Sequence, residues 1–446
     1  MLYKQLLVCF FETGSCLYEI EDKRGQNMQN LLETGFYISN LSVYRNLRND
    51  PVLDGLLQLA NMVRDRRYDV DLYAAAHVYS DLCRELMEYG GNLAAYLLHA
   101  AKYDINPFSL GCAADGGQSL DAVVWDAARN DLHSLAKIGM LTSGDIKAEL
   151  RARTGALSEM VNLLPDFTGS DRGADIENLA DFYQKNGIGI YAKYRAFSFS
   201  NQEGIQPIRS FDSIRLSDLK RYEIQRQKII ENTLGFLHNQ PYNNVLLYGD
   251  RGTGKSSTVK ALLNEYAEQG LRMVEVSKQD LIYIGKLLHE VGQMEKTKLK
   301  FILFIDDLTF NEDDENFGIL KALLEGSLTG RPKNLAVYAT TNRRHLIKET
   351  FSSREGDEVH MADTIDESLS LSDRFGLTVT FVKPDKAGFL DIVEKIAADR
   401  GLEIERELLL KGAERFALSR SGRSPRLARQ YIDHVQARLA LGLAID

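Results

Sequence analysis

Hydrophobic positions in the first part of the chain recur at the spacing of helices. Apolar residues return every three or four positions between residues 70 and 89, and again between residues 120 and 138. This spacing places them on one face of a helix in each segment. Paired glycines at 90–91 and 116–117 mark turns between such helices. The pattern predicts a mostly helical N-terminal domain over residues 1–200.

Farther along the chain, apolar runs of strand length alternate with helical segments. The runs that we expect to form strands are residues 245–248, 273–276, 301–305, 335–340 and 377–382. The helical patterns between them span residues 256–268, 280–288 and 319–328. Strand–helix alternation of this kind predicts a parallel sheet with helices on both faces. We therefore expect an α/β core over residues 201–383.

Two segments flank this core. Residues 188–200 carry four aromatic side chains among small ones, and they predict an extended segment that joins the N-terminal domain to the core. After Pro384 the pattern is helical to the end of the chain, and the expected helices are residues 385–400, 405–419 and 425–441. These three helices are expected to form a small lid over residues 384–446.

The composition fits a globular protein and narrows the classes of function. Hydrophobic residues make up 44% of the 446 residues and charged residues 26%, which is close to globular averages. A formal net charge of -9 argues against a cationic protein that wraps nucleic acid. The four cysteines form no CxxC pair, which indicates reduced thiols in a cytoplasmic protein. The apolar run at residues 6–11 is too short to cross a membrane, so we expect no membrane partner.

A glycine-rich motif follows the first predicted strand of the core. It fits the pattern GxxxxGK[ST] and consists of Gly249, Asp250, Arg251, Gly252, Thr253, Gly254, Lys255 and Ser256, with Ser257 next. Glycines let successive backbone N–H groups point at an anion, and the helix that follows presents its positive end to the same phosphates. Lys255 is expected to reach the β- and γ-phosphates of ATP, and the Ser256 hydroxyl to bind Mg²⁺.

Two carboxylates follow the third predicted strand. The run of apolar residues 301–305 is typical of a strand buried on both faces, and it ends in Asp306 and Asp307. The carboxyl end of such a strand faces the ligand crevice of the sheet. Asp306 is therefore the candidate for holding Mg²⁺, and Asp307 for orienting or deprotonating the attacking water. The alternative is an acidic strand end that leads into a solvated loop.

Three further polar residues are candidates that carry little weight alone. Asn342 ends the fourth predicted strand and is expected to hold the attacking water. Arg374 lies in a loop before the last strand, where a planar guanidinium suits the charge on a transferring phosphoryl group. Arg426 lies in the first turn of a helix that Pro425 opens. As isolated residues, both arginines have the alternative interpretation of surface charges.

The order of these motifs along residues 242–440 resembles the AAA+ superfamily. In that resemblance, the glycine-rich loop is Walker A, the strand with Asp306 and Asp307 is Walker B, and Asn342 is sensor 1. Arg374 matches the arginine finger and Arg426 matches sensor 2. The runs PYNNVLLYGDRGTGKSS, LLEG and YATTNRRH are similar to the bacterial AAA+ family catalogued as domain of unknown function 815, over residues 205–440.

The resemblance implies an ATPase that uses ATP and Mg²⁺ and works as a homo-oligomer. It implies that Arg374 acts on the nucleotide of a neighbouring subunit, and that Tyr222 lies in the segment that contacts the adenine. One position departs from the superfamily, because the second Walker B carboxylate is usually Glu and here it is Asp307. Either the strand end lies closer to the nucleotide, or hydrolysis is slow.

The biological task stays open between three classes. The first is a machine that remodels a protein client, and the second is a loader or regulator that acts on nucleic acid. The third is a slow nucleotide switch that signals by oligomerisation. Residues 283–285 (Tyr-Ile-Gly) match a pore loop that grips a polypeptide, or they belong to a packed helix face. Arg343, Arg344, His345 and Lys348 form a basic run that fits phosphate contacts or a solvated loop.

Overall fold

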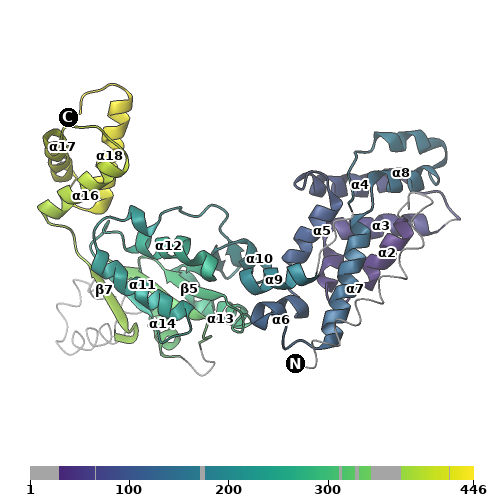
Figure 1. Ribbon diagram of the computed structural model, residues 1–446, viewed down its shortest axis with the longest axis horizontal. Coiled ribbons are helices and arrows are strands. Elements are labelled where there is room, and N and C mark those ends of the chain that lie inside the picture. Colours follow the sequence, from purple (N-terminus) through teal and green to yellow (C-terminus); the bar gives the residue numbers. More distant parts are fainter. Residues whose placement is uncertain are drawn as a thin grey trace, which may run out of the picture. The chain divides into compact units, whose positions relative to one another are not determined.

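The computed structural model describes residues 30–65, 67–170, 176–310, 314–326, 331–342, 373–420 and 422–445. These residues form two compact units. The first contains the described residues up to Ala101 together with Asp126–Ile176, and the second contains Lys102–Trp125 and the described residues from Glu177 onward. Figure 1 shows both units with their elements labelled.

The first unit is helical, as its hydrophobic pattern predicts. Its α-helices are α2 (Leu31–Asn40), α3 (Pro51–Arg64), α4 (Leu72–Met87), α5 (Leu93–Lys102), α7 (Ala122–Gly139) and α8 (Ser143–Arg151), and its 3-10 helices are η1 (Arg45–Asn49) and η2 (Gly155–Leu163). The last residue of α5 and the first turn of α7 belong to the second unit. Local signals start these helices. Asp50, for example, accepts hydrogen bonds from the Val52 and Leu53 amides, and Pro51 opens α3.

Three short helices precede the sheet in the second unit: α6 (Pro107–Asp115), α9 (Ile176–Asn186) and α10 (Gly189–Lys193). The segment predicted to be extended over residues 188–200 is extended only in its second part, and that part belongs to the sheet and is not a connection. Residues 189–193 form α10, and Ala196–Ser200 form β1, a strand of the main sheet. The aromatic side chains there are core residues, since Tyr191 and Phe197 are buried against each other.

The described residues form a sheet of seven strands in the order β2-β1-β4-β5-β6-β3-β7. Their bounds are β1 (Ala196–Ser200), β2 (Gly204–Pro207), β3 (Val245–Gly249), β4 (Leu271–Val276), β5 (Lys300–Ile305), β6 (Leu335–Thr341) and β7 (Leu377–Phe381). The five predicted strands are β3 to β7, and all their pairings are parallel. β1 and β2 extend the sheet at one edge as an antiparallel pair. The predicted parallel sheet is confirmed, with two strands that the sequence pattern did not reveal.

Helices and the sheet share one apolar core. The remaining helical elements of this part are η3 (Leu216–Asp218), α11 (Glu223–Leu237), α12 (Lys255–Tyr266), η4 (Ala267–Gln269), η5 (Lys278–Tyr283), α13 (Ile284–Gly292) and α14 (Glu315–Glu325). Phe236 of α11 and Leu262 of α12 pack with Leu247 of β3 and Phe304 of β5 in a single buried cluster. This packing fixes the start of α12 beside the end of β3.

The lid has its own core. It consists of α16 (Lys386–Asp399), α17 (Arg406–Ser419) and α18 (Pro425–Ala440), which lie together after β7 (Figure 1). Phe389 and Ile392 of α16 pack with Tyr431 and Ile432 of α18 in a cluster separate from that of the sheet. The three predicted lid helices are therefore present, each within a residue of its expected bounds.

The topology places β3 at a switch point of the sheet. β3 lies between β6 and β7, whereas the next strand in the chain, β4, lies beyond both β5 and β6. Ligands of open parallel sheets bind outside the carboxyl ends of the strands at such a point. The loop after β3 and the residues after β5 and β6 therefore lie where a ligand is expected.

Candidate functional site

A cavity of about 700 Å³ lies at this switch point. The glycine-rich loop forms its floor from Arg251 to Ser257. The other lining residues come from the segment before and within α11, from strand ends, and from the lid: Ile214, Asp218, Leu219, Lys220, Tyr222, Arg226, Thr258, Asp306, Asp307, Thr340, Asn342, Phe381, Ile392, Ile396, Pro425, Arg426, Arg429, Gln430 and Asp433. Core and lid thus enclose one polar cavity with apolar residues on the side of α16.

The loop turns tightly between β3 and α12. Gly249 has φ 135° and Gly254 has φ 98°, a region that side chains strongly disfavour. A Cβ at Gly249 would also overlap the Phe381 carbonyl. The residues at the start of α12 line the cavity. The first amides of a helix have no acceptor within the helix and suit an anionic ligand such as phosphate.

Lys255 is the buried cation of this floor. Its side-chain Nζ donates to the carbonyl oxygens of Gly249 and Asp250, both at 2.8 Å, and to the Asn342 Oδ1 at 3.0 Å. Burial lowers the pKa of Lys255, and the nearby carboxylates of Asp307 and Asp250 oppose that shift. The ammonium therefore lies at the cavity wall and is hydrogen-bonded to three neutral oxygens.

Ser256 and Asp306 meet at the ends of α12 and β5. The Ser256 hydroxyl donates to the Asp306 Oδ1 at 2.6 Å, and the Thr340 hydroxyl of β6 donates to the same oxygen. A hydroxyl and a carboxylate at this distance are oxygen ligands of the kind that Mg²⁺ takes in nucleotide sites. These residues fit the metal that the sequence pattern implies.

Asp307 has an unusual backbone. Its φ of 51° is in the left-handed region, which non-glycine residues seldom adopt. Its amide donates to the Thr340 Oγ1 at 3.0 Å, and its Oδ1 accepts from the Asn342 Nδ2 at 2.6 Å. Since Asn342 also accepts from Lys255, these three side chains form one hydrogen-bonded row along the cavity.

The loop is tied to the segment that leads into the lid. The Asp250 amide donates to the Phe381 carbonyl at 2.9 Å, and the Asp250 Oδ2 accepts from the Lys383 amide at 2.8 Å. Thr253 is buried and closes the loop internally by donating to the Asp250 carbonyl. Asp250 is therefore positioned by backbone groups and holds the β7–α16 connection against the loop.

Arg426 brings the lid to the loop directly. Its amide donates to the Gly252 carbonyl at 3.2 Å. A Cβ at Gly252 would lie 3.3 Å from the Arg426 Cβ and 3.1 Å from the Ser424 hydroxyl, so the absence of a side chain permits this approach. The start of α18 thus lies over the phosphate end of the cavity, and Arg426 lines it.

Tyr222 lines the cavity from the segment before α11. Its hydroxyl donates to the Val382 carbonyl at 2.6 Å, and its ring lies 5.2 Å from that of Phe381. Burial raises the pKa of Tyr222 to about 12, so the hydroxyl stays a donor at neutral pH. Tyr222 thus contacts both the cavity and the connection to the lid.

Arg374 lies apart from the other candidates. Its guanidinium pairs with Glu325 at the end of α14, and it is not among the described residues that line the cavity of its own chain. The structure therefore brings together the loop, Asp306, Asp307, Asn342, Arg426 and Tyr222, and it does not bring Arg374 to them.

Sequence reasoning missed several lining residues. Arg429 follows Arg426 by one helical turn, which is a signal that both face the same side of α18. From within a strand, the Thr340 hydroxyl donates to Asp306 and accepts from the Asp307 amide. No local pattern marks Lys220, just before α11, or Arg226, in the first turn of α11, because only the tertiary fold brings them to the cavity.

The Tyr-Ile-Gly run at residues 283–285 spans the junction of η5 and α13. Leu281, Ile284 and Leu287 are buried there at helical spacing, which supports a packed helix face. Tyr283 stays partly exposed. The basic run of Arg343, Arg344, His345 and Lys348 lies outside the described residues.

A parallel sheet with this loop, these strand-end carboxylates and a helical lid defines a AAA+ P-loop protein. A model of the family described as "Protein of unknown function (DUF815)" matches residues 192–439, more than half of the chain. The chain belongs to the DUF815 family.

Curated relatives are nucleotidases of archaea. The proteasome-activating nucleotidase of Thermococcus gammatolerans is 27% identical over 35% of this chain and 38% of its own length, and that of Pyrococcus abyssi is 29% identical over 34% and 38%. The match to the nucleotidase of Methanococcus maripaludis is 27% identical over 45% of this chain and 49% of the relative. The alignments thus span less than half of the length of these relatives.

Solved structures give a weaker likeness. The Thermotoga maritima RuvB Holliday junction branch migration motor aligns over 52% of this chain and 68% of its own, with a TM-score of 0.35 and 18% identity.

Among the described helices, none combines the length and apolar character needed to cross a bilayer.

Proposed function

We propose that this protein hydrolyses ATP in a Mg²⁺-dependent reaction and couples hydrolysis to movement of its lid. The observation that carries the proposal is the row of Lys255, Asn342 and Asp307 along the glycine-rich loop, beside the Ser256–Asp306 pair. Phosphate binding, metal binding and water activation each have a group there, and all of them face one cavity.

The residues have separate roles in this reaction. Lys255 exchanges the three neutral oxygens that it now contacts for phosphate oxygens, which carry charge. Asp307 accepts a proton from the attacking water or orients it, and Asn342 fixes the Asp307 carboxylate. Ser256 and Asp306 would hold Mg²⁺, which neutralises charge on the phosphates when bound.

Core and lid together enclose the nucleotide. Arg426 lies at the phosphate end of the cavity, while Ile392 and Ile396 of α16 offer apolar surface to a base. Tyr222 also lines the cavity. We assign it to the nucleoside part, in line with the adenine-contacting segment that the resemblance implies. Closing the cavity would exclude water from the phosphates and strengthen their contacts.

The test is phosphate release by the full-length protein. We expect release from ATP with Mg²⁺ and none after chelation with EDTA. Absence of both nucleotide binding and phosphate release in freshly purified protein would reject the proposal. Adding unfolded protein, single-stranded DNA or duplex DNA to the assay then separates a protein-remodelling machine from a nucleic-acid loader, and no stimulation at all favours a slow switch.

We further propose that Arg374 acts on the nucleotide of an adjacent copy in a homo-oligomer. Arg374 is not among the described residues that line the cavity of its own chain. This supports the role, because a guanidinium that acts between subunits reaches the cavity of a neighbouring copy. An arginine finger is worth about 10³–10⁵ in rate.

Mixing two inactive variants tests this arrangement. Arg374→Ala keeps its loop intact, and Lys255→Ala keeps its Arg374, so mixed interfaces combine both functional groups. We expect partial activity to return and to rise with protein concentration. Mixed oligomers that form and stay inactive would show that Arg374 does not act between subunits.

A further inference from the structure

Three consecutive residues before α11 reach toward the lid. Lys220, Arg221 and Tyr222 lie in a turn in which Arg221 and Tyr222 both have left-handed φ values, 66° and 65°. Non-glycine residues adopt this region only where the surroundings impose it. The Arg226 guanidinium holds the turn by donating to the carbonyls of Leu219 at 2.7 Å and Arg221 at 2.6 Å.

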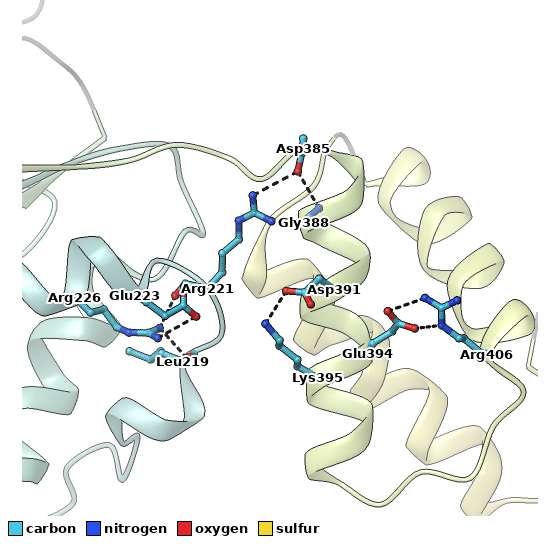
Figure 2. A network of polar contacts seen from close by, with 10 residues as sticks. All are labelled: Leu219, Arg221, Glu223, Arg226, Asp385, Gly388, Asp391, Glu394, Lys395 and Arg406. Atoms are coloured by element: carbon cyan, nitrogen blue, oxygen red, sulfur yellow. Dashed lines mark hydrogen bonds and ion pairs between the residues drawn. The ribbon is translucent and has the colours of Figure 1, made fainter.

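Arg221 extends from this turn to the first turn of α16 (Figure 2). Its Nη2 lies 3.6 Å from an oxygen of Asp385, the N-cap residue of α16, and the same oxygen accepts from the Gly388 amide at 2.9 Å. A Cβ at Gly388 would overlap the Arg221 guanidinium. The glycine therefore leaves the space in which the arginine lies.

This position is electrostatically unfavourable for an arginine without its partner. The N-terminus of a helix carries partial positive charge and repels a cation. Asp385 offsets that repulsion by lying between the guanidinium and the helix amides. The contact is therefore specific to this arrangement of Arg221, Asp385 and Gly388.

The neighbours of Arg221 hold two other points of the lid connection. Lys220 pairs with Asp399, the last residue of α16. Tyr222 donates to the Val382 carbonyl, in the connection between β7 and α16. One turn of the core thus contacts the connection, the start and the end of the same lid helix.

That helix also lines the cavity. Ile392 and Ile396 of α16 face it, and Lys220 and Tyr222 line it from the core side. We propose that Arg221 is a positioning residue for the nucleotide site, which acts through Asp385 and Gly388 to hold α16 over the cavity. The effect on nucleotide affinity rests on the proposed function, whereas the effect on the lid does not.

The ion pair by itself does not account for such a role. Asp385 is exposed and Arg221 is partly exposed, and ion pairs at the surface contribute little to stability. The role comes from geometry, because loss of the contact lets the lid sample orientations that do not complete the cavity. If the site is complete in only a fraction of the molecules, the apparent dissociation constant equals the intrinsic one divided by that fraction.

Two variants remove the contact from opposite sides. Arg221→Ala deletes the guanidinium, and Gly388→Ala fills its space while favouring the helical state of α16. Arg406→Ala is the matched control, because it deletes an exposed arginine whose partner, Glu394, lies within the lid (Figure 2).

Lid position is measured in the full-length protein by the distance between two spin labels. One label replaces the exposed Lys228 of α11 and the other the exposed Ala437 of α18, with the native cysteines replaced. Without nucleotide, we expect Arg221→Ala and Gly388→Ala to broaden the distance distribution, and Arg406→Ala to leave it unchanged. The double variant should be no broader than either single variant, since both remove the same contact.

Nucleotide affinity is the second measurement. We expect both variants to weaken binding of ATP by about 5-fold or more, with Arg406→Ala equal to the wild type. An unchanged distance distribution in Arg221→Ala overturns the inference, whether or not ATP binds. A broadened distribution with unchanged ATP affinity overturns the link to the site. A wild type that binds no ATP rejects the proposed function, and the distances still decide whether Arg221 holds the lid.

Discussion

Both units of this protein bury lysines, and Lys147 of the first unit and Lys255 of the second have opposite kinds of partner. Lys147 of the helical unit is 5% exposed and donates to the Asp166 carboxylate at 2.7 Å. Lys255 of the second unit is 6% exposed and donates to two carbonyls and an amide oxygen. The charge of Lys147 is neutralised in place, while that of Lys255 is held by dipoles.

This difference separates a structural charge from one that is available to a ligand. A cation already paired with a carboxylate gains little from a second anion. A cation held by neutral oxygens gains a charge-assisted bond when an anion arrives. Burial alone is therefore no indication of function. Neutral partners alone are not one either, because buried Lys300 donates to the Asn239 Oδ1 and is not among the described residues that line the cavity. Lys255 differs from Lys147 both in its neutral partners and in its place at the cavity.

An aspartate and a tyrosine of the first unit can also be compared with an aspartate and a tyrosine at the cavity. Asp131 of the first unit is 1% exposed, and its Oδ2 accepts from the amides of Ser42, Val43 and Tyr44. Asp307 instead lies exposed at the cavity in a left-handed conformation. Tyr79 donates to the Pro165 carbonyl within the first unit, as Tyr222 does to Val382 beside the cavity.

The lysines give the largest expected contrast. Lys255→Met should abolish ATP binding and turnover, because the phosphates lose the buried cation of the loop. ATP at about 1,000 times its dissociation constant should stabilise the wild type by roughly 4 kcal/mol, seen as a thermal shift. Lys147→Met should keep that shift and change stability only slightly, since its partner Asp166 is exposed and can be solvated. An equal loss of the thermal shift in both variants would contradict the distinction between a structural lysine and a ligand-binding one.

The aspartates should differ in what they affect. Asp307→Asn keeps the size of the group and tolerates the left-handed backbone, so ATP should bind while turnover falls by about 10²–10⁴. Asp131→Asn should leave turnover per folded molecule unchanged and lower the free energy of unfolding by about 1–3 kcal/mol. Phosphate release and chemical denaturation measure the two effects. Turnover of Asp307→Asn within a factor of about two of the wild type would remove Asp307 from the reaction.

The two tyrosine variants should give the smallest difference between the units. They also make the most closely matched comparison, because each deletes the same kind of hydrogen bond. Tyr79→Phe and Tyr222→Phe each delete one hydroxyl-to-carbonyl hydrogen bond, worth about 1 kcal/mol of stability. Only Tyr222→Phe should also weaken ATP binding, by a few-fold, because its bond holds the connection to the lid. Calorimetric titration with ATP measures the difference. Equal affinities in the two variants would make Tyr222 a structural residue like Tyr79.

Much of the fold was readable from hydrophobic spacing. The strands β3 to β7 and the lid helices α16 to α18 were predicted within a few residues, because apolar runs and 3.6-residue stripes are strong signals. β1 was missed, since a short aromatic segment between helices resembles a connection. Its status as a strand depends on pairing with β4, far along the chain.

The glycine-rich loop, Asp306 and Asp307 were predictable because their chemistry demands those residue types in one order. The residues that complete the cavity were not. Lys220 lies before α11 and Arg226 in its first turn, whereas Arg429 follows the loop by most of the chain's second half.

The sequence by itself determined the class of this protein, since an anion-binding loop needs glycines, a lysine and a hydroxyl at contiguous positions. Tertiary structure alone decided which groups surround that loop. The Lys255–Asn342 and Arg221–Asp385 contacts join residues 87 and 164 positions apart, the latter being the difference between 385 and 221. Such contacts leave no local pattern, because they depend on the packing of strands and helices that are distant in the chain.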